Sequence, residues 1–495
     1  MNATLEDCQW DWDERGCDRC DRCTRRTRAY TFRFNIMQDL TRGSISNHLF
    51  KTASFMLVTM VFQTLYFLVD LYWVGRLGKE AVAGVGVAGN LSFIVLAISQ
   101  MLAVGTTTLV AHAAGQKNHE RALLIFNQSQ LLSIIVGAVF LVVAMLFRIQ
   151  YAQALSADAT TAALAADYLL WFLPAMGLQF ALVAMSAALR GIGNFKPGMI
   201  VQTATVILNI VLAPVLMFGW VTGRPMGVAG TALATFIAVM VGVTWLATYF
   251  VGKQAYLKFL REDMKPQMSL WKALLKIGLP AGAEFALMAV YLMIVYTVTR
   301  PFGAAAQAGF GIGMRIVQAL FMPVVALGFA VAPVAGQNVG ARLGDRVKAV
   351  FKTACAMAAS VMFLAAVACN IAPAALIRIF SDDPAVIAVG DEYLRIISWN
   401  FVASGLVFVT SSMFQALGNT IPPLFASLSR MLVIAVPVVL LSRLPGFELR
   451  WIWYLSVAAI LIQLTMILLL LRREFRLRLD PMAVAPIPGS APATG

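Results

Sequence analysis

The sequence predicts an all-α polytopic membrane protein with twelve transmembrane helices in two six-helix lobes, related by a pseudo-twofold axis along the membrane normal. Three observations support this fold class. Of the 495 residues, 60% are hydrophobic and only 13% are charged, about half the charged fraction of a soluble domain. Apolar stretches of about 20 residues, the length that crosses a bilayer, occur twelve times. Several local patterns of the first half return in the second.

Polar residues mark the boundaries of the twelve apolar stretches. A helical period in hydrophobicity does not mark them, because helices surrounded by lipid and protein are apolar on all sides. The first six cover about residues 49–74, 82–112, 123–147, 160–188, 197–220 and 227–252. The second six cover about residues 278–300, 307–335, 349–373, 388–416, 422–445 and 450–471.

An internal repeat with a constant offset of 225 residues relates the two sets of spans. Leu77-Gly78 returns as Phe302-Gly303. The same offset relates four further pairs: Gly115 and Gly340, Tyr168 and Tyr393, Gly193-Asn194 and Gly418-Asn419, and Pro197 and Pro422. Since each unit has an even number of spans, both units enter the membrane in the same sense. Two similar lobes facing a central cavity favour alternating access over a fixed pore.

The spans and charges together predict five segments. These are a cytoplasmic N-terminal extension expected to be disordered (1–46), an N-lobe with helices 1–6 (47–252), a cytoplasmic linker (253–276), a C-lobe with helices 7–12 (277–473) and a disordered cytoplasmic tail (474–495). Lys and Arg concentrate in the loops that share a side with both termini, which places that side in the cytoplasm. The same loops explain the net charge of +14 without nucleic acid.

Metal and cofactor chemistry has little support in the sequence. Only three histidines occur, so a histidine-ligated metal centre is not expected. The run Cys8, Cys17, Cys20 and Cys23 has spacing typical of iron–sulfur or zinc ligands, but no Cys-Pro follows and arginines crowd the segment. A plain alternative is that the natural chain begins near Met37. We expect no cofactor other than a coupling ion.

Asp70 is the most informative polar residue because eight of the 24 acids precede residue 47 and acids within spans are costly. It either reaches the headgroups from the end of the first span or forms a cation or proton site. Neutral oxygen ligands accompany it at helical spacing: Gln63 on the first span, Gln202, Thr205 and Asn209 on the fifth, and Thr231 and Thr235 on the sixth. Such a set suits Na⁺ or a proton relay, although these side chains also commonly join packed helices.

The second lobe carries a different polar set. Glu284 lies in the seventh span, while Arg315 and Arg430 lie in the eighth and eleventh. Opposite charges at membrane depth tend to pair, so Glu284 is either a structural partner of an arginine or a second titrating or drug-binding acid. Tyr291 shares the face of Glu284 and is placed to line the same cavity.

Several of these motifs resemble the multidrug and toxic compound extrusion (MATE) antiporters, in particular the prokaryotic branch with an N-lobe coupling site. The residues are Leu65-Tyr66-Phe67-Leu68-Val69-Asp70, Val74-Gly75-Arg76-Leu77-Gly78, Ile207-Leu208-Asn209-Ile210, Gly227-Val228-Ala229-Gly230-Thr231, Gly278-Leu279-Pro280 and Gly336-Gln337-Asn338-Val339-Gly340-Ala341. The resemblance covers about residues 37–475. It implies a monomeric exporter of cationic or amphiphilic drugs and dyes in the bacterial inner membrane, driven by Na⁺ or H⁺.

The resemblance also implies that Asp70, Tyr168, Asn209 and Thr231 form the coupling site. Two competing functions have less support in the sequence. A flippase for lipid-linked saccharides would need a more cationic cavity than Arg315 and Arg430 provide. An intramembrane enzyme is disfavoured because no H-E-x-x-H sequence or nucleophile–base pair is visible.

Three positions depart from the family pattern. A second acid common in this branch is replaced by Ala213, so a bound Na⁺ would meet one formal negative charge, which favours proton coupling. The glutamate that another branch uses in the seventh helix would fall at Met288, about one turn after Glu284. The usual first-helix proline, which Pro280 matches in the second half, is replaced by Phe55.

Overall fold

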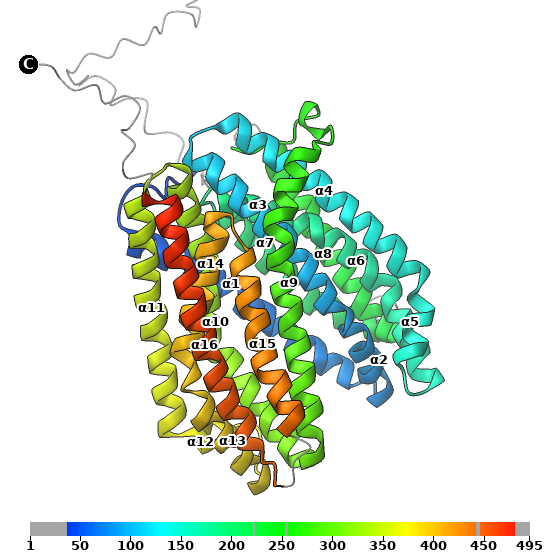
Figure 1. Cartoon of the computed structure of the whole chain (residues 1–495). Coiled ribbons are helices and arrows are strands. Elements are labelled where there is room, and N and C mark those ends of the chain that lie inside the picture. Colours follow the sequence, from blue (N-terminus) through cyan, green and yellow to red (C-terminus); the bar gives the residue numbers. More distant parts are fainter. Residues whose placement is uncertain (1–36, 221–222, 253–255, 442–445, 481–495) are drawn as a thin grey trace, which may run out of the picture.

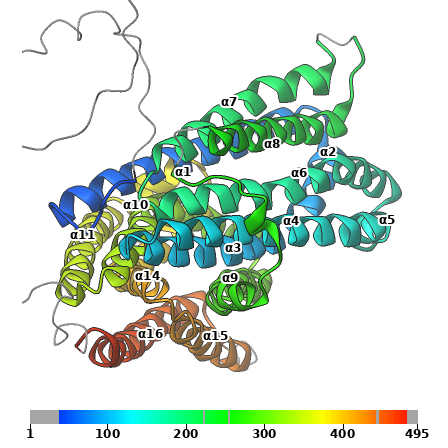
Figure 2. The same cartoon turned by 90° about the horizontal axis from the view of Figure 1, so that it is seen from above.

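The computed structural model describes residues 37–220, 223–252, 256–441 and 446–480. Within these ranges the chain is helical, without β-strands, and twelve helices are long and apolar enough to cross a membrane. The helices form two neighbouring bundles that run roughly side by side (Figures 1 and 2). The predicted all-α, twelve-span, two-lobed fold is therefore confirmed.

The N-lobe supplies the first six spans. Its helices are α1 (Ile45–Gly75), α2 (Lys79–Gly89), α3 (Leu91–Gly115), α4 (His119–Leu146), α5 (Arg148–Leu155), α6 (Ala159–Gly191), α7 (Lys196–Phe218) and α8 (Gly227–Val251). The second span consists of α2 and α3, which meet at Asn90. Helix α1 is continuous and contains no proline, in keeping with Phe55 at the position where the family has one.

The C-lobe repeats this order after a short 3₁₀ turn, η1 (Glu262–Met264), in the linker. Its helices are α9 (Met268–Thr299), η2 (Arg300–Phe302), α10 (Ala304–Gly340), α11 (Gly344–Ile371), α12 (Pro373–Arg378), α13 (Pro384–Ile397), α14 (Asn400–Leu417), α15 (Ile421–Leu441) and α16 (Leu449–Arg478). The tenth predicted span is divided between α13 and α14, and only α14 is long and apolar enough to count as a span.

Backbone conformation supports the 225-residue repeat independently of residue type. Lys117 and Arg342 lie 225 positions apart and are the two described non-glycine residues with positive φ, at 56° and 58°. Side chains rarely adopt this left-handed conformation, so the same turn after α3 and after α10 indicates a shared origin. Gly78 with Gly303 (φ 110° and 87°) and Gly193 with Gly418 (77° and 73°) show the same agreement.

Three segment boundaries differ from those expected from hydropathy. Helix α9 begins at Met268 and α16 continues to Arg478, because charged turns extend these helices beyond their apolar parts. Residues 37–41 pack against the protein rather than being disordered, and Leu40 is fully buried, so the predicted N-terminal extension does not reach residue 46 as disordered chain. The four N-terminal cysteines and the tail from residue 481 lie outside the described residues.

The linker is attached to the N-lobe by two buried amide side chains of α4. Asn127 donates to the carbonyl of Lys258 at 3.0 Å and accepts from the N–H of Leu260 at 3.1 Å. Gln128 accepts from the N–H of Gln267 at 2.9 Å. Because buried amides that use both donor and acceptor hold their partners firmly, the linker is structurally part of the N-lobe.

The lobes meet closely at the end of the molecule where α1 begins and α16 ends, which we call the terminal end (upper end of Figure 1). A Cβ atom added to Gly115 of α3 would lie 2.0 Å from the carbonyl oxygen of Gln337 in α10. One added to Gly340 would lie 2.2 Å from the carbonyl oxygen of His112. Only glycine permits such backbone approach, so the seam between the lobes is tightly closed here.

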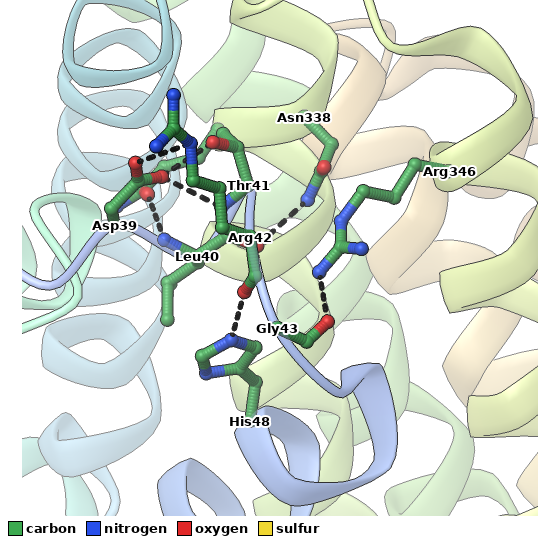
Figure 3. A network of polar contacts seen from close by, with 9 residues as sticks. Asp39, Leu40, Thr41, Arg42, Gly43, His48, Asn338 and Arg346 are labelled. Carbon is green, nitrogen blue, oxygen red and sulfur yellow. Dashed lines mark hydrogen bonds and ion pairs between the residues drawn. The ribbon is translucent and has the colours of Figure 1, made fainter.

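Residues 37–43, which we call the strap, bind across this seam (Figure 3). Leu40 donates its N–H to Gln337 Oε1 at 3.0 Å and accepts from Asn338 Nδ2 at 3.3 Å. The strap is joined to the N-lobe as well, through the N–H of Gln38 and the carbonyl of Ile192 at 3.2 Å. It therefore connects the two lobes at the terminal end.

Candidate functional site

Asp70 lies in the last two turns of α1. Its Oδ1 atom is buried and has no hydrogen-bond partner. Among the residues that the structure describes, no Lys or Arg forms an ion pair with it; all the pairs found involve other acids. A carboxylate with one oxygen buried and no counter-ion is costly in its charged form, and binding a proton or a cation relieves that cost.

Helices α7 and α8 bring neutral oxygen atoms to the same part of the lobe. Asn209 donates through Nδ2 to Thr235 Oγ1 at 2.9 Å, and its own Oδ1 is buried without a partner. Thr235 in turn donates to the carbonyl of Thr231 at 3.1 Å. The hydroxyl of Tyr66 lies 3.2 Å from Thr235 Oγ1 and so ties α1 to this pair.

Two tyrosines complete what we call the N-lobe site: Asp70, Tyr66, Tyr168, Asn209, Thr231 and Thr235. Tyr168 of α6 is 5% exposed, and both Tyr66 and Tyr168 lie within electrostatic reach of Asp70. Sequence reasoning missed Tyr66, although its position one helical turn before Asp70 was a usable signal.

The other neutral candidates do not join this cluster. Gln63 is exposed. Thr205 donates to the carbonyl of Gln202 at 2.9 Å, a local bond within α7. Ala213, where the family branch often has an acid, is 1% exposed and lies one turn beyond Asn209. The N-lobe site thus contains one carboxylate.

Glu284 has serine partners in the structure. The Ser411 hydroxyl of α14 lies 3.0 Å from each carboxylate oxygen and donates its hydrogen between them. Ser427 of α15 donates to Oε1 at 3.0 Å. Gln463 of α16 donates to Ser427 Oγ at 3.2 Å. The two serines and the glutamine come from three other helices, and no sequence spacing identified them.

The arginines that were candidate partners of Glu284 lie elsewhere. No ion pair joins Glu284 to Arg315 or Arg430 in the described residues. Arg315 is exposed. Arg430 instead lies over the ring of Tyr291, with its guanidinium carbon 5.4 Å from the ring centroid.

The described part of the chain contains no group of three His, Cys, Asp or Glu side chains placed to hold a metal ion. Cys355 and Cys369 are free thiols of α11, as expected of small apolar packing residues. The predicted Cys8–Cys23 run is not among the described residues. The polar clusters at Asp70 and Glu284 therefore remain the candidate sites.

Twelve apolar helices in two repeated lobes, with a half-buried acid within a span of each lobe, define a multi-pass membrane protein of the type found among secondary transporters. Residues 56–215 and 280–441 each match the MatE family model, one segment per repeat. The chain belongs to this family, and the resemblance noted in its sequence is confirmed.

Relatives of similar length carry names of exporters or resistance proteins rather than enzymes. The chain is 25% identical over 417 residues to the probable multidrug resistance protein YoeA of Bacillus subtilis, covering 83% of this chain and 90% of that protein. It is 26% identical over 410 residues to the multidrug export protein MepA of Staphylococcus haemolyticus, covering 81% and 88%.

Solved structures show the same fold. A multidrug resistance MATE family transporter in an outward-facing conformation superimposes with a TM-score of 0.80 at 23% identity, over 90% of this chain and 98% of that one. A MATE structure in a bent conformation gives a TM-score of 0.84 at the same identity and coverage.

Proposed function

We propose that this protein is a secondary active multidrug efflux antiporter that exports cationic or amphiphilic compounds in exchange for H⁺ or Na⁺ by alternating access. The observation that carries the proposal is the half-buried carboxylate of Asp70 within an apolar helix, whose buried Oδ1 has no hydrogen-bond partner. The names of its relatives support multidrug export, and the cationic or amphiphilic substrate class follows from the family resemblance.

Asp70 is suited to ion exchange because it has no permanent counter-ion. A proton or Na⁺ satisfies it in one state, and its release leaves a negative charge that attracts an organic cation or the next ion. The unpaired Asn209 Oδ1 and the hydroxyls of Tyr66, Thr231 and Thr235 provide neutral oxygens nearby. With Ala213 in place of a second acid, the site favours a proton, since one carboxylate compensates poorly for the dehydration of Na⁺.

Transport follows when ion and drug favour opposite arrangements of the lobes. The seam is closed at the terminal end, and in an alternating-access cycle the site is then reached from the opposite end. The loop charges support a cytoplasmic terminal end in a bacterial inner membrane, and this arrangement then faces outward. The protein acts as a monomer in the lipid bilayer, with no cofactor beyond the coupling ion.

Ethidium efflux from inverted vesicles tests the proposal when a pH gradient and a Na⁺ gradient are imposed separately. We expect the pH gradient to drive efflux in the wild type and Asp70→Asn to abolish it without loss of inserted protein, because an amide neither exchanges a proton nor balances a cation. Asp167→Asn, the same change at an exposed acid of α6, serves as the matched control. Wild-type efflux in Asp70→Asn, or no transport under either gradient, contradicts the proposal.

A further inference from the structure

The repeat places equivalent tyrosines in the two lobes but charges of opposite sign beside them. Tyr66 and Tyr168 of the N-lobe correspond at the 225-residue offset to Tyr291 and Tyr393 of the C-lobe. The N-lobe pair lies within electrostatic reach of Asp70. The C-lobe equivalent of Asp70 is the buried, uncharged Val295, and the charge near the second tyrosine pair is carried by a different residue.

That charge belongs to Arg430, near the middle of α15. Its guanidinium lies over Tyr291 at 5.4 Å and within electrostatic reach of Tyr393. Its Nε atom is buried and has no hydrogen-bond partner. In the part of the chain that the structure describes, Arg430 forms no ion pair.

Glu284 of the neighbouring helix α9 is the expected acidic partner of Arg430, but its oxygens already accept hydrogen bonds from serines. Ser427, one turn before Arg430, donates to Glu284 Oε1, and Ser411 donates to both oxygens. The C-lobe therefore keeps its acid and its arginine apart rather than neutralising one with the other.

An arginine at this depth needs an anionic partner for a physical reason. The guanidinium stays charged in proteins, and a charge within a membrane-spanning helix is costly unless it is paired or faces a polar cavity. The ring of Tyr291 offsets part of this cost through a cation–π contact. The N–H donors suit a carboxylate or a similar planar anionic group.

We propose that Arg430, Tyr291 and Tyr393 form an anion-binding subsite of the C-lobe that takes the carboxylate of an aromatic, amphiphilic substrate. With Asp70 in the other lobe, the transporter then accepts zwitterionic compounds as well as simple cations. This inference rests on the proposed multidrug function and assigns residues of the C-lobe to the recognition of carboxylate-bearing substrates.

Two dyes that differ only in a methyl ester test the subsite. Rhodamine 110 carries a free carboxylate, and rhodamine 123 is its methyl ester. Binding of each dye to the purified full-length protein is measured by fluorescence anisotropy. We expect the wild type to bind the acid at least as tightly as the ester. Arg430→Gln should raise the Kd of the acid at least about tenfold, the loss of one hydrogen bond to a charged group, and change that of the ester less than about twofold.

Matched variants separate recognition from a structural role. Arg315→Gln, the same change at an exposed arginine, should alter neither Kd, and Arg430→Lys should retain part of the preference for the acid. Equal weakening of both dyes in Arg430→Gln, or no change in either, overturns the subsite. So does a loss of thermal stability in Arg430→Gln that Glu284→Gln restores, because the two residues would then be a structural pair.

The wild type alone distinguishes this inference from the proposed function. If it binds neither dye, the multidrug proposal fails. If it binds the ester but not the acid, only the anion subsite fails. Should Arg430→Gln not fold, the wild-type ratio of the two Kd values and the Arg430→Lys variant decide the question.

Discussion

His112 and Gln337 are equivalent residues of the two repeats, and each bonds to a carbonyl at the end of a helix in the opposite lobe. His112 Nε2 lies 2.7 Å from the carbonyl oxygen of Ala416, and Gln337 Nε2 donates to that of Gly191 at 3.0 Å. Ala416 and Gly191 are themselves 225 residues apart. A carbonyl only accepts, so His112 donates through Nε2, and the closed seam is held by a symmetric pair of bonds.

Two adjacent threonines of α3 give a matched test of this seam. Thr108 donates to the carbonyl of Gln415 across the seam, whereas Thr107 donates to Ala187 within the N-lobe, both at 3.0 Å. Each bond contributes about 1 kcal/mol. Thr108→Val should therefore raise the population of molecules whose lobes are separated at the terminal end about fivefold. Thr107→Val should lower stability without this shift.

Double electron–electron resonance measures this population. Spin labels replace Glu120 and Asp345, exposed equivalent residues beside the seam, in a chain whose native cysteines are changed to serine. Identical distance distributions in the two valine variants would show that the cross-lobe bond does not set the equilibrium between arrangements.

Gly340→Ala should prevent full closure of the terminal end. The new methyl group would lie 2.2 Å from the carbonyl oxygen of His112, and a backbone atom cannot move aside as a side chain can. We expect a long-distance population in the same resonance measurement and slower efflux. Gly86→Ala, where a methyl group meets nothing within 4 Å, is the control; a short distance retained in Gly340→Ala refutes the prediction.

Ala213→Asp should increase Na⁺ stimulation of efflux relative to the wild type. Ala213 is buried one turn beyond Asn209, and a carboxylate there supplies the second negative charge that a dehydrated Na⁺ lacks. Ala213→Asn adds similar volume without charge and should not reproduce the effect. The measurement is dye efflux at constant pH and membrane potential with varied Na⁺. Strong Na⁺ dependence of the unmodified protein would remove the basis for this prediction.

Glu284→Gln should reduce drug binding or efflux more than thermal stability. The glutamine keeps the size and an acceptor oxygen for Ser411 or Ser427, and its amide can donate to a hydroxyl. Thermal unfolding and turnover per folded molecule are compared with those of Ser411→Ala, which removes a donor but keeps the acid. A marked fall in stability with normal turnover would assign Glu284 a purely structural role.

Hydropathy and the repeat were sufficient to predict the spans and the lobes, because membrane thickness and duplication leave local signals in the sequence. Asp70, Asn209 and Thr235 were also found, since helical spacing places polar atoms on one face. The partners of Glu284 were not predicted, because Ser411 and Ser427 lie on separate helices whose rotation and depth depend on packing across the whole lobe.

The duplicated scaffold carries different chemistry in its two halves. Asp70, Asn209 and Thr235 correspond at the repeat offset to Val295, Ile434 and Ile460, all of them buried and apolar. Fold symmetry alone therefore does not predict where the second polar site lies.

The strap also constrains the order of biosynthesis. Leu40 is synthesised early, yet its partner Gln337 follows 297 residues later. At about 5–20 residues per second, the ribosome takes on the order of tens of seconds to reach that glutamine. The first six helices must therefore enter the membrane and pack while the strap has no C-lobe to bind. Leu40 therefore binds Gln337 late, after membrane insertion, because this contact forms only once the second half of the chain has been inserted and has folded.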